Sequence, residues 1–87
     1  MPARLMEDAL RAWREGERVL DTLSPLSRDH QTVQLAINDL RATYQRLASL
    51  KVATRDVLTA NREAIEEARK VIHDVAPRAM RPRSAGR

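Results

Sequence analysis

The sequence has no cysteine and no phenylalanine, and it has only one tryptophan and one tyrosine in 87 residues. The lack of cysteine excludes disulfides and thiolate metal ligands. Glycine (two) and proline (four) are also scarce. Because β-rich domains need frequent turn residues and aromatic side chains, this composition predicts an all-α protein. A chain of this length forms one domain at most, and a small core makes oligomerisation an expected source of further stability.

Long apolar runs are absent as well. No run approaches the roughly 18 residues that a membrane span requires. The N-terminal segment carries Glu7, Asp8, Glu15 and Glu17, so it lacks the apolar stretch of a signal peptide and is too acidic for a transit peptide. We therefore expect a cytoplasmic protein.

The positive charge is concentrated at the C-terminus. The net charge is +4, and no acidic residue follows Asp74. Basic and acidic residues balance up to Ala76, so the excess comes from Arg78, Arg81, Arg83 and Arg87. The segment 77–87 also contains two prolines and a glycine and has no apolar pattern. We expect a helical domain over 1–76 and a disordered, Arg-rich tail over 77–87.

The first apolar stripe predicts an amphipathic helix from about Pro2 to Thr22. Its positions recur at spacings of three and four, which is the period of one helix face; they are Leu5, Ala9, Ala12, Gly16, Val19 and Leu23. Three of these residues are small. We expect another helix to approach closely at Gly16, with Trp13 filling space beside it.

The segment Ser24-Pro25-Leu26-Ser27 predicts the end of this helix, because the residue before a proline avoids helical dihedral angles. Two starts of the next helix are open. Either Ser24 precedes Pro25 at the first helical position, or Ser27 is the N-cap with Asp29 in the first turn. The connection is short in both cases, so the next helix should fold back on the first.

From Ser27 to Ala76 there is neither glycine nor proline, and one heptad frame fits nearly the whole stretch. We call its two apolar rows, with a third row beside them, the seam. The rows are Ile37, Tyr44, Lys51, Leu58, Ile65 and Ile72; Val33, Leu40, Leu47, Thr54, Asn61, Ala68 and Val75; and Leu50, Val57, Ala64 and Val71.

Two architectures satisfy this frame. One is a helical hairpin with a short first helix and one long second helix. The other is a three-helix bundle with a second turn near Ser49 to Thr54, which helix-length statistics favour. The apolar face keeps its phase through Leu50 and Val57, and no breaker residue marks a turn. We therefore predict the long helix and keep the bundle as the alternative.

Polar residues interrupt the seam at Lys51, Thr54 and Asn61. Such residues fix register and oligomer number at some expense of stability, or they mark a stretch that faces solvent. Thr54 is also a suitable cap for a third helix in the bundle. On one flank an arginine row, which most simply pairs with acids or covers a solvated face, consists of Arg41, Arg55, Arg62 and Arg69.

The sequence predicts no catalytic, cofactor or metal site. Neither His30 nor His73 has a carboxylate one helical turn before it, as helical metal sites require. Both glycines are isolated, so no phosphate-binding loop is present. No serine and histidine form a convincing catalytic pair. We expect no enzyme and no small-molecule substrate.

The most direct interpretation is a non-enzymatic helical interaction or assembly protein, which acts as a subunit, adaptor or scaffold. The first helix can cover the second only to about Leu47, so the remaining apolar stripe should meet a second copy or another helical protein. The predicted interface is Leu50, Val57, Leu58, Asn61, Ile65, Val71, Ile72 and Val75. The alternative is a small basic nucleic-acid-binding protein, or an adaptor for acidic membrane surfaces, that uses Arg78, Arg81, Arg83 and Arg87.

Overall fold

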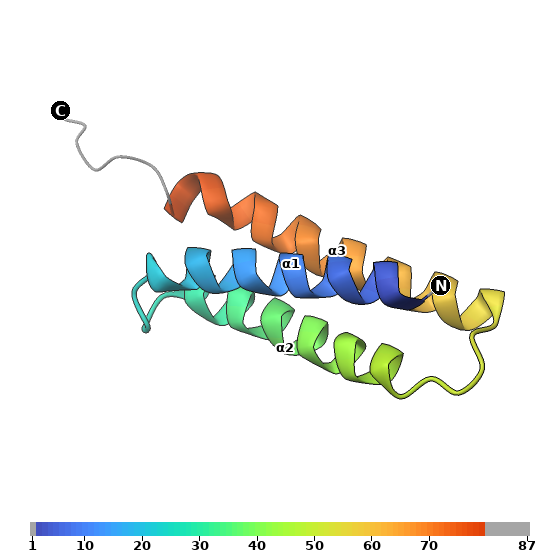
Figure 1. Ribbon diagram of the computed structural model, residues 1–87. Helices are drawn as coiled ribbons and strands as arrows, with labels where there is room; N and C mark the ends of the chain where they lie inside the picture. The colour runs from blue at the N-terminus through green and yellow to red at the C-terminus, as the bar shows by residue number, and fades with distance from the viewer. Residues whose placement is uncertain (1, 80–87) are drawn as a thin grey trace, which may run out of the picture.

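The computed structural model describes residues 2–79, which form three helices (Figure 1). They are α1 (Pro2–Asp21), α2 (Arg28–Ala48) and α3 (Arg55–Ala79). Each helix packs against both of the others, and α2 runs antiparallel to α1 and α3. The all-α prediction is confirmed. The predicted long second helix is wrong, and the alternative three-helix bundle is the fold.

α1 is amphipathic, as predicted, and its apolar stripe faces the other two helices. Ala9 and Val19 are fully buried, and Leu5 and Ala12 nearly so. Trp13 is half-buried beside them and meets the ring of Tyr44 edge to face, with centroids 6.3 Å apart. The core of the bundle consists of Leu5, Ala9, Ala12, Val19, Val33, Ala36, Ile37, Leu40, Leu47, Ile65, Ala68, Ile72 and Val75.

Gly16 lies where the three helices meet. A Cβ atom placed on Gly16 would lie 2.9 Å from Cγ1 of Ile37 in α2 and 2.9 Å from Cδ1 of Ile72 in α3. Both distances are shorter than carbon atoms tolerate, so only glycine fits here without displacement of its neighbours. The expected close approach at Gly16 is confirmed, and it involves two helices.

The first connection, between α1 and α2, follows one of the two predicted starts. Ser27 is the N-cap of α2, and its Oγ accepts a hydrogen bond of 3.0 Å from the backbone N–H of His30. This bond satisfies one of the free N–H groups at the start of the helix. Asp29 adds an acidic side chain to the first turn, where the helix dipole favours negative charge.

The second connection, Ser49–Thr54, breaks the segment that continuous apolar phase predicted to be one helix. The Ser49 hydroxyl donates to the carbonyl of Gln45 at 2.9 Å, so α2 ends with a side chain that competes for a helical acceptor. At the other end, Thr54 Oγ1 accepts from the N–H of Val57 at 3.2 Å and caps α3. Leu50 lies half-buried on the core between these two caps.

Burial explains why the chain turns here. In a single long helix, the apolar side chains beyond Leu50 would face water, and each gains roughly 1.5–3 kcal/mol when fully buried. Folding back places Ile65, Ile72 and Val75 in the core. The turn gives up only a few helical hydrogen bonds, each worth a net of about 1 kcal/mol. Tertiary packing therefore outweighs local helix continuity.

The C-terminal end of α3 lies beyond the expected boundary at Ala76. The helix continues through Pro77 and Arg78 to Ala79. Pro77 is in the last turns, where its missing N–H removes a single helical hydrogen bond. The rest of the predicted disordered tail lies outside the described residues. No helix of the described chain is long and apolar enough to cross a bilayer.

The first prediction concerns the cap of α3. Thr54→Ala should lower the free energy of unfolding by about 1 kcal/mol, because the N-cap bond to Val57 is lost. In a continuous helix the same change would raise it, because alanine is the better helix former. Thr59→Ala, an exposed site inside α3, is the matched control and should be neutral or slightly stabilising. Urea unfolding of the two variants measures the sign of each change in the free energy of unfolding. A Thr54→Ala variant that is more stable than the wild-type chain would contradict the break.

The second prediction concerns the contact at Gly16. Gly16→Ala should destabilise the bundle by about 1 kcal/mol, because overpacking exceeds the gain in helix propensity. Ile72→Val removes the Cδ1 atom that the new methyl group meets. The destabilisation caused by Gly16→Ala should therefore be smaller in the Ile72→Val background than in the wild-type chain, by at least about 0.5 kcal/mol. Strictly additive effects in denaturant melts would show that the two side chains do not compete for this space.

Candidate functional site

Half of the residues of the predicted partner interface lie inside the bundle, and the other half lie at its edges. Asn61, Ile65, Ile72 and Val75 are buried among the chain's own helices. The other predicted residues are half-buried along the edges of α3 and in the second connection; they are Leu50, Val57, Leu58 and Val71. The unpartnered stripe that required a second chain belonged to the long helix, so that argument for a partner no longer holds.

Asn61 is the one polar seam residue that reaches the core. Its Nδ2 donates to the carbonyl of Val57 at 2.8 Å, and its Oδ1 accepts from Nε of Arg46 at 3.4 Å. The Arg46 guanidinium also donates to the buried hydroxyl of Thr43 at 3.0 Å. This cluster joins α2 to α3 at one axial position. Lys51 and Thr54, by contrast, lie exposed in the second connection.

The helix break divides the predicted arginine row. Arg41, on α2, lies over the Trp13 ring, with its Cζ atom 5.5 Å from the ring centroid. Arg55, Arg62 and Arg69 are exposed on α3. Within residues 2–79, none of the four arginines forms an ion pair with a carboxylate. The row is therefore no single stripe along one helix.

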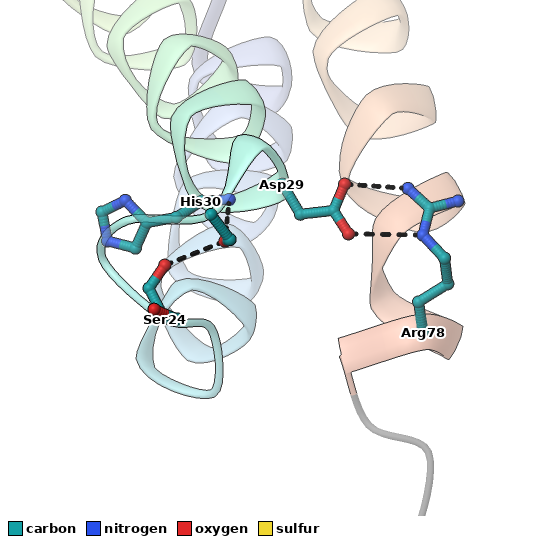
Figure 2. Close-up of polar contacts among 5 residues, drawn as sticks. Ser24, Asp29, His30 and Arg78 are labelled. Carbon is teal, nitrogen blue, oxygen red and sulfur yellow. Dashed lines mark hydrogen bonds and ion pairs between the residues drawn. The ribbon is translucent and has the colours of Figure 1, made fainter.

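Arg78, the first of the predicted anion contacts, is engaged within the bundle (Figure 2). Its Nη2 and Nε donate to the two carboxylate oxygens of Asp29 at 3.1 and 3.3 Å. These hydrogen bonds and the negative charge of Asp29 hold the pKa of the Arg78 guanidinium above its usual value. The pair joins the last turn of α3 to the first turn of α2. Arg81, Arg83 and Arg87 lie outside the described residues.

Two of the three most exposed large apolar side chains of the described residues lie near each other, one in the first connection and one on α2; the third, Val52, lies in the second connection. Leu26, in the first connection, is 97% exposed, and Leu35 is 59% exposed. Two shallow hollows share Leu35. The first follows the connection and is lined by Pro25, Leu26, Ser27, His30, Gln31, Gln34 and Leu35. The second lies between α2 and α3 and is lined by Thr32, Leu35, Ala36, Asp39, Glu67, Ala68 and Val71. We call the two hollows together the leucine surface.

The charges around the molecule differ from face to face. Asp39 and Glu67 are the only charged residues lining the second hollow. On α1, a separate shallow hollow is lined by Arg11, Arg14 and Arg18, and its one acidic residue is Glu7. The leucine surface is thus apolar with an acidic rim, whereas the outer face of α1 is basic.

Sequence reasoning missed the leucine surface because neither leucine belongs to the seam. Leu26 lies in the segment 24–27, whose proline predicts only the end of a helix, and Leu35 is out of phase with Val33 and Ile37. A large apolar residue that is out of phase with a buried stripe must point away from the core. That signal was present in the sequence and would have found Leu35.

The described residues bring few chemistry-bearing groups together. His73 Nε2 lies 3.5 Å from a carboxylate oxygen of Glu15, and both side chains are substantially exposed. Within residues 2–79, no three histidine or carboxylate side chains are close enough to hold a metal ion. Comparison of the chain with protein-family models, curated proteins and solved structures finds no significant match.

Proposed function

We propose that this chain is a non-enzymatic helical interaction protein, which binds a helix of another chain on the leucine surface. The observation that carries the proposal is the exposure of Leu35, which joins two hollows on one side of a small bundle. A leucine gains roughly 1.5–3 kcal/mol on going from full exposure to full burial, and Leu35, which is 59% exposed, has a large part of that gain still to make. Its position outside the core therefore favours a role in binding.

The shape of the surface favours a helix as the bound element. The second hollow is a groove between α2 and α3, and the ridges of one helix pack into such grooves on another. Small side chains form its floor, since Ala36 and Ala68 are buried there. Helix-in-groove recognition uses apolar anchors at helical spacing, and polar rim residues orient the anchors.

Other expectations stay predictions. A cytoplasmic location is one of them, and binding of nucleic acid or an acidic membrane through the C-terminal arginines is another. Arg78 is engaged with Asp29, so an anion would have to compete with that carboxylate. The remaining tail arginines are not among the described residues.

The third prediction tests binding at the leucine surface. A photo-crosslinking amino acid at position 35, in the cells from which the protein comes, should give one discrete crosslinked product. The same amino acid at Val52 is the matched control, because Val52 is 70% exposed but lies in the second connection, away from this surface.

A further substitution sharpens this test. Leu26→Ser, in the chain that carries the crosslinker at position 35, should remove most of the product, because it deletes the second apolar anchor. Its thermal melt should match that of the parent chain, since Leu26 is almost fully exposed. The same products from positions 35 and 52, or no product from position 35, would contradict binding at this surface.

A further inference from the structure

The outer face of α2 carries a charge on each side of Leu35. Arg28 precedes Leu35 by seven residues, and Asp39 follows it by four, so all three lie on one face of the helix. Arg28 and Asp39 are both exposed. Among residues 2–79 the ion pairs are His73 with Glu15 and Arg78 with Asp29. Neither Arg28 nor Asp39 therefore has an oppositely charged partner within the described part of the chain.

The charges on this face of α2 are complementary to those on the same face of a second copy. When two copies of α2 pack antiparallel, Arg28 of each copy can face Asp39 of the other, and a two-fold axis passes between positions 33 and 34. A symmetric contact of this kind forms every interaction twice. Parallel packing would instead place Arg28 against Arg28 and Asp39 against Asp39, which like-charge repulsion disfavours.

The apolar groups fit the same register. With Arg28 opposite Asp39, Leu35 of one copy lies opposite Thr32 of the other. Thr32 lines the hollow between α2 and α3, beside Ala36 and Val71. Each Leu35 can thus enter the other copy's hollow as a knob enters a hole. The register that pairs the charges is therefore also the one that covers Leu35 of each copy.

We propose that the helix bound on the leucine surface is α2 of a second copy of this chain, packed antiparallel through Arg28, Leu35 and Asp39. This inference rests on the proposed function and names its partner. The contact covers one helix face and a small number of side chains, which is less than a permanent dimer buries. The dimer is therefore weak, and it weakens further with added salt because its orientation depends on exposed charges.

The fourth prediction is a charge exchange measured on the full chain by sedimentation equilibrium at low ionic strength. Arg28→Asp and Asp39→Arg should each raise the dimer dissociation constant by about tenfold, since each puts like charges in contact at two places. The double variant Arg28→Asp/Asp39→Arg should recover the original value within about threefold. An equimolar mixture of the two single variants should form heterodimers, because one copy then offers two acids and the other two arginines.

Folding is controlled separately. Aspartate at position 28 lies in the first turn of α2, where negative charge is favourable, and arginine is a good helix former at position 39. Arg14→Asp reverses a charge on the outer face of α1 and should leave dimerisation unchanged. Thermal melts of all variants identify any loss of structure.

The outcomes separate the two proposals. A wild-type chain that stays monomeric in the millimolar range overturns the second copy as partner, and so does a double variant that fails to recover association. If such a monomer still gives a discrete crosslink to a different protein from position 35, the proposed function stands. If neither association nor a discrete crosslink occurs, both proposals fail.

Discussion

The close contact of three helices at Gly16 is the constraint on which the rest of the bundle depends. Because Gly16 has no side chain, Ile37 and Ile72 both reach the backbone of α1 at this point. α1 is thereby held against α2 and α3 together, and the side chains of Ala9, Ala12 and Val19 are buried. A chain without disulfides and with few aromatic side chains reaches close packing here through small residues. The short connections then need only join helices whose positions are already set.

The sequence predicted those elements whose causes are local. The stripe of α1, its close approach at Gly16 and the cap at Ser27 follow from side chains within a few residues of one another. The break at Ser49–Thr54 could not be read in this way. Two helices that face one core share the same heptad frame when their connection preserves register, so continuous phase does not show a continuous helix. The polar residues Lys51 and Thr54, at successive seam positions, were the available signal for the turn.

Because the break was not predicted, the expected partner interface was placed on residues that the bundle buries. Ile65, Ile72 and Val75 needed a partner only if α3 extended away from α1, and inside the bundle they are core residues. Apart from Val52 in the second connection, the large apolar side chains that remain exposed among the described residues are Leu26, in the first connection, and Leu35, on α2, and both lie outside the seam. Asn61 was predicted only as a polar residue on the seam, either buried or facing solvent, and its burial and its link to Arg46 depend on the fold of the whole chain. Which apolar residues are free to bind therefore follows from tertiary structure, whereas periodicity identifies only those that can be buried.

The central claim is that the chain reverses after α2 and brings α3 against α1. A distance between α1 and α3 tests this claim most directly. The chain has no cysteine, so Glu15→Cys/His73→Cys can carry two spin labels without competing sites. In the bundle these side chains are neighbours, with His73 Nε2 3.5 Å from Glu15. Pulsed electron spin resonance on the dilute chain should give a short distance, set by the arms of the two labels. In the long-helix hairpin, position 73 would lie about 60 Å beyond the residue opposite position 15, at 1.5 Å per residue. A distance near that value would contradict the bundle and the free α2 face with it.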